Sequence, residues 1–178
     1  MGIHFLTIFW TFYMGMAVSP QKTTFYKITG VITETSSYCG GAAPSDELIK
    51  ELETPKPIAF KKMFVKLGNV NKANAKVIKE FTTDSLGQFS LKLPYGQYCL
   101  VDEDKVNDAK YKLILTKYAV KTESNEPVDP KCLAKWFAQP DYIFSVSKKS
   151  AKKIAHNYHR ACNWSGAPCV IYNGPFPP

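Results

Sequence analysis

The clearest pattern of apolar and polar positions lies between Phe81 and Val101, in the stretch FTTDSLGQFSLKLPYGQYCLV. Every second residue from 89 to 93 is apolar and those between are polar, which is the period of a strand with one buried face. A second alternating run follows the Pro94-Tyr95-Gly96 break and places Tyr98 and Leu100 on its apolar face. The segment therefore predicts two strands joined by a Pro-Gly turn, as a hairpin or as a corner between sheets.

Turn and cap residues indicate where other elements begin. Asp84-Ser85-Leu86-Gly87 offers an Asp that can bond nearby backbone and a Gly that tolerates positive φ, so a tight turn is expected there. Ser45 followed by acidic residues predicts a short helix over residues 45–52, and Asp129-Pro130 predicts another that runs to residue 137. Residues 110–119 are compatible with a strand or a helix. Further strands are expected over residues 24–35, 61–67, 75–82, 141–146 and 153–162.

The same segment carries a family motif, T-D-x-x-G-x-F-x-L-x-L-P-x-G-x-Y-x-L. The residues that fill it are Thr83, Asp84, Gly87, Phe89, Leu91, Leu93, Pro94, Gly96, Tyr98 and Leu100. This pattern resembles the core of the carboxypeptidase regulatory-like domain, a member of the transthyretin-like (prealbumin-like) β-sandwiches. The resemblance implies an all-β fold, a transthyretin-like Greek-key β-sandwich with one or two short helices in insertions.

The resemblance extends upstream and covers residues 26 to 101. Residues 28–33 resemble the family's opening strand, and residues 57–65 resemble its P-L-x-G-x-x-V-x-V segment. Two departures stand out: a long insertion between Thr33 and Pro57, and Phe60 where the family usually carries a small or glycine-like residue. The motif is structural, so it implies the fold more firmly than a function.

The amino terminus has the character of an export signal. Residues 1–17 hold an apolar run of about 15 residues, shorter than the ~20 that cross a bilayer as a helix, and Gly15-x-Ala17 offers small residues for cleavage. Cleavage near Ala17 is expected, with an uncleaved anchor as the alternative, because the segment contains no Lys or Arg. The remaining residues 18–178, in a chain that is 45% hydrophobic, suffice for a single β-sandwich domain with a C-terminal extension that contains cysteines.

Export changes the interpretation of the five cysteines. In an oxidising compartment, Cys39, Cys132, Cys162 and Cys169 are candidates for disulfides, and the odd count leaves one cysteine over. Cys99, between apolar strand residues, is expected as a buried thiol that behaves as a small hydrophobe. Cys162 and Cys169 enclose a short loop and could pair with each other, but Cys39 or Cys132 could equally reach this segment. The connectivity stays open.

The net charge of +8 does not by itself indicate nucleic-acid binding. The lysines are spread over the chain, and the densest group, residues 148–153, is expected to form a solvated basic loop between two strands. Aromatic residues of the kind that single-stranded nucleic-acid binders interleave with basic ones are absent there. If the group binds anything, an anionic surface such as lipopolysaccharide or an acidic partner is favoured over DNA.

The sharpest chemical pattern is His156-Asn-Tyr-His159-Arg-Ala-Cys162. Imidazole and thiolate both bind zinc or copper, so these three residues form a candidate metal site. The two histidines would share a face on a helix but point to opposite faces on a strand. A strand is expected here, and an oxidised Cys162 would not be a ligand. The favoured interpretation is therefore an ordinary polar strand, without a cofactor.

An enzymatic interpretation comes only through the fold. Intradiol dioxygenases share this type of sandwich and hold ferric iron with two tyrosines and two histidines. The chain offers Tyr95, Tyr98, His156 and His159, but the H-x-x-H spacing departs from the family's arrangement. No G-x-S-x-G or H-E-x-x-H motif is present. A non-catalytic protein is expected.

Carbohydrate binding is a third class of function, because several sandwiches of this type are sugar-binding modules. The candidate stacking residues are Trp136, Trp164 and Tyr172. The alternative is that Trp136 packs its helix against the sandwich and Trp164 fills the C-terminal loop.

The combined expectation is a secreted interaction or accessory module, periplasmic or associated with the outer membrane of a bacterium. Its expected partner is a protein of the cell envelope, with a glycan as the second possibility, no nucleic acid, and membrane attachment only if residues 1–17 are retained. Its binding surface is expected in residues 39–57 and 162–178, since loops on a rigid scaffold commonly carry function. Addition of a partner strand to a sheet edge is another route.

Overall fold

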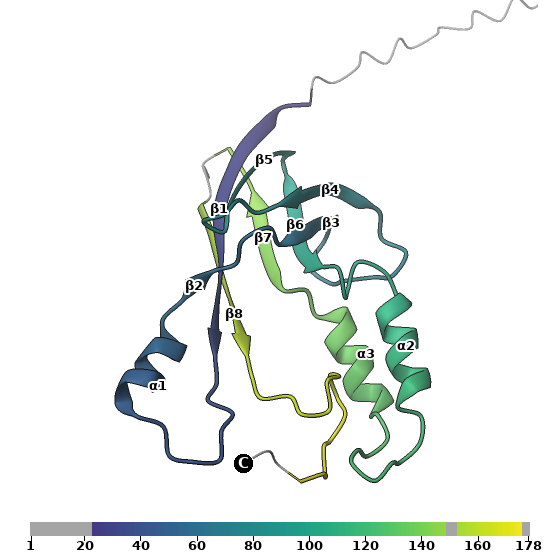
Figure 1. Ribbon diagram of the computed structural model, residues 1–178. Coiled ribbons are helices and arrows are strands. Elements are labelled where there is room, and N and C mark those ends of the chain that lie inside the picture. Colours follow the sequence, from purple (N-terminus) through teal and green to yellow (C-terminus); the bar gives the residue numbers. More distant parts are fainter. Residues whose placement is uncertain (1–22, 149–152, 176–178) are drawn as a thin grey trace, which may run out of the picture.

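The computed structural model describes residues 23–148 and 153–175 and shows two four-stranded sheets packed face to face, with three short helices (Figure 1). The expected all-β sandwich is confirmed. The expected segments 1–17, most of the basic group at 148–153 and the end of the tail lie outside the described residues. The elements are β1 (Phe25–Ser36), α1 (Asp46–Glu53), β2 (Lys56–Pro57), β3 (Lys62–Leu67), β4 (Val77–Thr82), β5 (Gln88–Pro94), β6 (Gly96–Asp102), α2 (Ala109–Lys117), α3 (Pro130–Ala138), β7 (Tyr142–Val146) and β8 (Lys153–Arg160).

The first sheet is organised around the 12-residue β1, which has partner strands on both edges. One edge pairs antiparallel with β5 from Phe25↔Pro94 to Val31↔Gln88, and then with the short β2. The other edge pairs parallel with β8, from Thr29↔Lys153 to Ser36↔Arg160. The second sheet is antiparallel throughout, in the order β4-β3-β6-β7.

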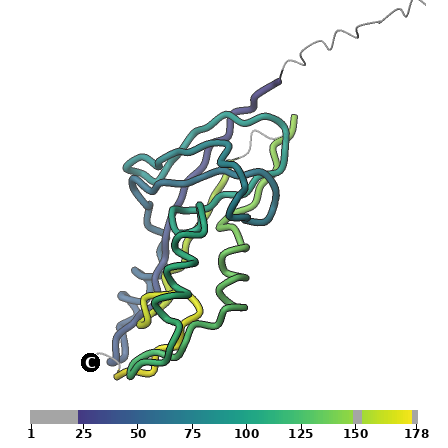
Figure 2. The backbone as a smooth tube through the Cα atoms, turned by 90° about the vertical axis from the view of Figure 1, so that its right-hand side faces the viewer, coloured from purple at the N-terminus to yellow at the C-terminus, as the bar shows by residue number. Residues whose placement is uncertain are grey.

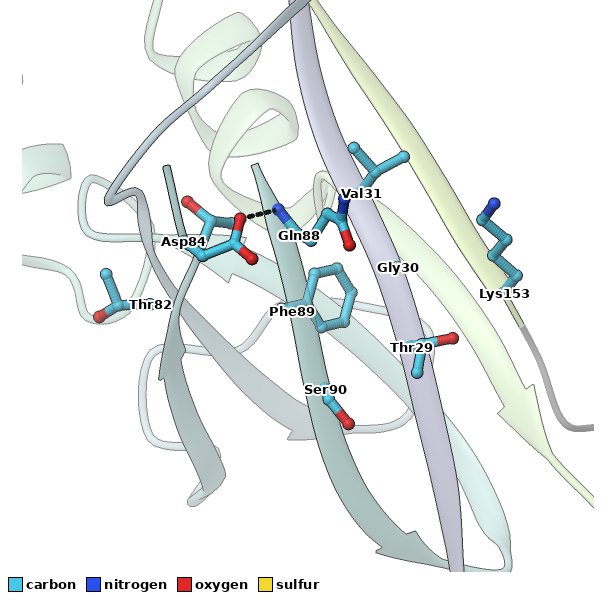
Figure 3. A pocket seen from close by; sticks show the side chains of 10 residues that line it. Thr29, Gly30, Val31, Thr82, Asp84, Gln88, Phe89, Ser90 and Lys153 are labelled. Carbon is cyan, nitrogen blue, oxygen red and sulfur yellow. Dashed lines mark hydrogen bonds between the residues drawn. The ribbon is translucent and has the colours of Figure 1, made fainter. Parts of the chain in front are cut away.

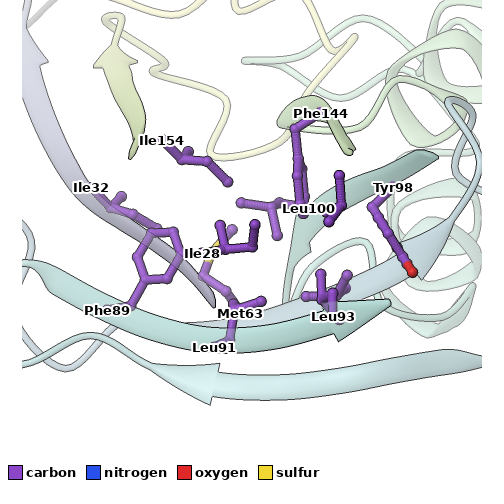
Figure 4. Close-up of a cluster of buried hydrophobic side chains, with 12 residues drawn as sticks. Ile28, Ile32, Met63, Phe89, Leu91, Leu93, Tyr98, Leu100, Phe144 and Ile154 are labelled. Carbon is purple, nitrogen blue, oxygen red and sulfur yellow. The ribbon is translucent and has the colours of Figure 1, made fainter. Parts of the chain in front are cut away.

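The core lies between the sheets and is made from the alternating positions that the sequence singled out (Figure 4). Phe89, Leu91 and Leu93 of β5 point inward, as do Tyr98 and Leu100 of β6. They pack with apolar residues of the other strands, including Ile28, Ile32, Met63, Val65, Phe144, Val146 and Ile154. The period-2 pattern therefore located the buried faces of both strands correctly.

The outer face of the second sheet is also covered, which the alternation did not predict. Cys99 and Lys66, which face each other across β6 and β3, are both fully buried. The Lys66 ammonium donates hydrogen bonds to Asn71 Oδ1 at 2.8 Å and to the carbonyl of Lys72 at 3.0 Å. Burial lowers the pKa of Lys66, because the charged ammonium loses its hydration.

Asn71 ties the cover of this sheet together. Its amide donates to the carbonyls of Lys105 and Phe137, both at 2.9 Å, and its backbone N–H donates to the carbonyl of Ala138. One side chain thus joins the β3–β4 loop, the segment after β6 and the end of α3.

Helices α2 and α3 lie beside the C-terminal segment (Figure 2) and form a second, smaller core with it. Ile114 of α2 and Leu133 of α3 are buried in it beside Val128 and Ala167. The hydroxyl of Tyr118 donates to the carbonyl of Ser165 at 2.8 Å, which fixes the start of this segment.

The capping residues act as the sequence predicted. Ser45 accepts a bond from the Leu48 N–H at the start of α1, and Asp129 caps α3 with Pro130 in the first turn. Residues 110–119, compatible with strand or helix, contain most of α2. The structure therefore has three helices in the described residues, where one or two were expected.

The turn at residues 84–87 is confirmed in detail. Asp84 Oδ1 accepts from the N–H groups of Leu86 and Gln88, and Gly87 has φ +69°. The backbone is strained at a second turn, because Phe60, which is not a glycine, also has a positive φ, of +55°. Phe60 is 72% exposed, so its side chain has little packing that would offset this strain. Glycine enters the positive-φ region without the Cβ penalty, so the backbone at residue 60 is one that favours glycine.

We predict that Phe60→Gly is more stable than Phe60→Ala by about 1 kcal/mol, because glycine enters the left-handed region without the Cβ penalty. At Leu86, an exposed turn residue with ordinary φ, the order should reverse. Urea unfolding of the four variants measures both differences. Equal stability of the two Phe60 variants would contradict the backbone argument.

We also predict that Asn71→Ala lowers the free energy of unfolding by about 3 kcal/mol, since it strips a buried ammonium of one acceptor and leaves two carbonyls without a donor. The matched control is Asn157→Ala, which removes exposed bonds to Thr33 and Thr35 and should cost about 1 kcal/mol or less. Urea midpoints of the two variants make the comparison, and similar losses would argue against the buried junction.

Candidate functional site

The insertion after β1 and the C-terminal segment meet at one end of the sandwich. The parallel ladder of β1 and β8 ends at Ser36↔Arg160, and one more bond follows, from Ser37 N–H to the carbonyl of Arg160 at 2.9 Å. Two residues after Ser37 and two after Arg160, Cys39 and Cys162 form a disulfide with a Cα–Cα distance of 5.6 Å. The two segments that the sequence selected as a binding surface are therefore joined covalently.

A groove of about 310 Å³ lies along this junction. One wall consists of Ser36, Ser37 and Cys39, and the other of residues 160–164, which include Trp164. Both cysteines are exposed, and Trp164 is 38% exposed. We call this feature the disulfide groove. It combines an aromatic ring and a disulfide with the ends of two strands.

Polar contacts fix the strand ends that frame the disulfide groove. Arg160 forms an ion pair with Glu34 at 2.9 Å. The ring nitrogens of His159 lie within hydrogen-bond distance of the hydroxyls of Ser37 and Thr35, at 2.9 and 3.2 Å. These contacts link β8 to β1 by side chains as well as by backbone, so the two walls are held in one position while the disulfide is intact.

Helix α1 stands in the insertion beside this end of the molecule. It buries none of its residues completely, and Leu48 is 37% exposed. Its loop is held by the short pairing of β2 with β1 and by the Cys39–Cys162 bond. The insertion is therefore attached at its two ends, with little packing between them.

The structure gives the pairing of the five cysteines. Cys39, Cys132, Cys162 and Cys169 all form disulfides, and Cys99 is the buried free cysteine, as expected. The suggested Cys162–Cys169 pair is wrong, because Cys162 leaves β8 beside β1 and pairs with Cys39. Cys169 lies instead against α3 and pairs with Cys132.

The three residues of the candidate metal site are not brought together. His156 faces the interior from β8, His159 faces outward, and Cys162 is engaged in a disulfide. The described residues contain no group of three or more His, Cys, Asp or Glu side chains placed to hold a metal ion. As a three-residue site this hypothesis is wrong, for the reason that strand geometry gives.

His156 is instead part of an aromatic and charged cluster between the sheets. Its ring lies 4.4 Å from that of Tyr158 and 5.7 Å from that of Tyr142, and its Nε2 is buried without a hydrogen-bond partner in the described residues. Burial lowers the pKa of His156, Asp141 opposes this effect, and Lys105 and Lys61 add to it. Burial also raises the pKa of Tyr158, as do Asp141 and Asp102.

The charges in this cluster form two ion pairs. Lys105 pairs with Asp141 at 2.9 Å, and Lys61 pairs with Asp102 at 3.3 Å. The Lys61 ammonium also lies 4.7 Å above the Tyr158 ring. These matched charges and rings connect residues beside β3, β6 and β7 with His156 and Tyr158 of β8.

The other aromatic candidates are also separated. Tyr95 is 73% exposed in a turn, whereas Tyr98 is buried in the core and donates to the carbonyl of Pro94. Trp136 packs in the second core with Lys105 at 5.2 Å from its ring, and Tyr172 donates to the carbonyl of Pro175. The four dioxygenase candidates therefore do not form one iron site, and of the three sugar-binding candidates Trp164 is the one that lines the groove.

The structure also contains a larger pocket, of about 740 Å³, that the sequence did not predict (Figure 3). It lies over β1, β5 and the start of β8, where Thr29 is paired with both Ser90 and Lys153. Its floor is the Phe89 ring, which approaches Gly30 so closely that an added Cβ would come within 2.5 Å. A glycine inside a strand pattern is the signal that could have indicated this approach. Two polar residues in its lining, Thr83 and Asp84, already bond neighbouring backbone.

Comparison with known proteins adds no assignment. No protein-family model matches the chain, and no curated protein matches it significantly. Among the helices of the described residues, none has the length and apolar character needed to cross a membrane.

We predict that His156 makes the fold less stable at acidic pH. The pKa of His156 is lower in the folded protein than the ordinary 6.5. Below pH 6.5 the unfolded chain therefore binds a proton at this histidine more readily than the folded chain does, and the free energy of unfolding falls as pH drops. His156→Phe keeps a ring and removes this titration.

The free energy of unfolding of the two proteins, measured in urea from pH 7.5 to pH 5, tests this. The difference between variant and parent should grow in favour of the variant as pH falls. At pH 7.5, where histidine is neutral in both states, the comparison gives the packing change alone. Parallel curves would contradict the prediction.

Proposed function

We propose that this protein is a secreted, non-catalytic interaction module that binds a protein of the bacterial cell envelope through the disulfide groove. The observation that carries the proposal is the Cys39–Cys162 bond, which unites the insertion and the C-terminal segment into one exposed surface on a rigid sandwich. Loops held on such a scaffold are where binding function concentrates.

Export is supported by two kinds of observation. Four of five cysteines form disulfides, which are typical of oxidising compartments. Residues 1–17 have the short apolar run and the small residues Gly15 and Ala17 that a signal peptide carries before its cleavage site. We propose the periplasm or outer-membrane surface as the location. The resemblance to transthyretin-like carboxypeptidase regulatory-like domains, which often accompany surface receptors and enzymes, agrees with an accessory role.

The lining of the disulfide groove favours a protein as the partner. Trp164 offers a large, partly exposed ring, and tryptophan is among the residues that dominate protein interfaces. The ion pair between Arg160 and Glu34 supplies a charged rim beside it. A glycan is the second candidate, because the same ring could stack on a sugar. The metal-binding alternative receives no support, since its three residues point apart.

We predict that a benzophenone amino acid at position 164 captures one defined partner when the protein is expressed in its exporting cell. The control position is Tyr95, an exposed aromatic residue at the opposite end of β1 from Cys39, where no such adduct should form. Mass spectrometry identifies the adduct. Equal capture from both positions, or none from position 164, would count against the groove.

Affinity gives the second readout once the partner is known. Trp164→Ala should weaken binding by about 30-fold, which corresponds to ~2 kcal/mol for an aromatic hot spot. Tyr95→Ala should leave the affinity unchanged. Retention on a polysaccharide that is lost with Trp164→Ala, without a protein adduct, would instead favour the glycan.

A further inference from the structure

We propose that the Cys39–Cys162 disulfide is a thiol–disulfide exchange site, opened by a dithiol reductant, and that its opening dismantles the disulfide groove. The regulatory part of this inference rests on the proposed function. The exchange chemistry stands on the accessibility of the bond.

The accessibility of this bond is visible in the structure. Cys39 and Cys162 are both exposed and both line the 310 Å³ groove. An attacking thiolate must reach a sulfur in line with the disulfide, so access to the bond controls the rate of exchange. A groove along the bond supplies room for a reductant's active-site segment.

The second disulfide lies in different surroundings. Cys169 packs against the second hydrophobic core, and its carbonyl accepts from the N–H of Asp129, the capping residue of α3. The segment around it is also held by backbone bonds from Glu126 to Ile171 and from Asn173 to Ser124. The Cys132–Cys169 bond is therefore embedded in a structure that persists around it.

Cys99 does not compete in this chemistry. It is fully buried in β6, and burial raises the pKa of its thiol, which keeps it protonated. Among the disulfides, Cys39–Cys162 has both cysteines exposed along the groove, whereas Cys132–Cys169 has an exposed Cys132 and a half-buried Cys169, so the groove pair is the more accessible of the two.

A dithiol reductant supplies both electrons that reduction of this disulfide requires. One thiolate of the reductant attacks a sulfur of the pair, forms a mixed disulfide and releases the other cysteine as a thiolate, which takes up a proton. The reductant's second thiolate then attacks the mixed disulfide and frees the remaining cysteine. Two electrons pass to the protein, and the reductant leaves as its own disulfide.

Opening the bond removes the covalent link between the two walls of the groove. Ser36 and Ser37 stay attached through the β1–β8 ladder, the Ser37 N–H bond to Arg160 and the His159 contacts, but the loop that leads to α1 loses its anchor beyond Ser37. Since α1 buries none of its residues completely, nothing in its packing replaces the lost bond. Trp164 and the insertion no longer form a single surface.

The test measures each cysteine separately. The oxidised protein is incubated with increasing dithiothreitol at neutral pH, exposed thiols are alkylated with one isotopic label, and the remainder with a second label after denaturation and full reduction. Peptide mass spectrometry should show Cys39 and Cys162 labelled about tenfold faster than Cys132 and Cys169, with Cys99 unlabelled until the protein unfolds. Simultaneous or reversed reduction of the two disulfides would overturn the proposal.

A protein reductant supplies the second measurement. A C-x-x-C dithiol protein whose second cysteine is replaced by serine should trap a mixed disulfide on Cys39 or Cys162. A trap found on Cys132 or Cys169 instead would also overturn the assignment.

The link to binding is measured with the benzophenone at position 164. Protein alkylated at Cys39 and Cys162 alone should lose about nine-tenths of the adduct that the oxidised protein gives. An unchanged adduct overturns the regulatory part. Absence of an adduct from the oxidised protein refutes the proposed function, while the labelling rates still decide whether the bond is an exchange site.

Discussion

The register of β1 against β8 is the constraint on which the molecule depends. β1 is the only strand of its sheet, among the described residues, with partners along both edges, and the parallel ladder runs in step to Ser36↔Arg160. Because β-strand side chains alternate, a slip by one residue would expose Ile154 and bury its neighbours. The same register places Cys39 and Cys162 within bonding distance. The pairing of β1 with β8 therefore determines both the sheet and the groove.

The rest of the fold is arranged around this sheet in two layers of packing. The apolar interior fills the sandwich, while the outer face of the second sheet is closed by loops that Asn71 holds together. This cover is what allows Lys66 to be buried as an ammonium with only neutral oxygens as acceptors. Helices α2 and α3 and the C-terminal segment then add a separate core, joined by the Cys132–Cys169 bond.

Local patterns in the sequence were sufficient for most strands and two of the helices, because alternation and capping depend on neighbours in the chain. Leu91 or Ser45 could be interpreted without knowledge of the fold. Partners distant in sequence could not: the β1–β8 pairing and the Cys39–Cys162 bond, separated by 123 residues, are set by tertiary packing. Lys66 was missed for a related reason, since a lysine in an alternating strand is ordinarily exposed, and only its cover makes it internal.

Burial of Cys99 has a consequence for how the chain acquires its covalent bonds. The newly synthesised chain carries five thiols, and any of them can pair wrongly until one is removed from reach. β6 becomes inaccessible only when it lies between β3 and β7 and its outer face is covered. Sheet assembly hides the odd thiol and brings Cys39 beside Cys162, and packing of the second core brings Cys132 beside Cys169. The pattern of apolar residues therefore selects which cysteines can pair.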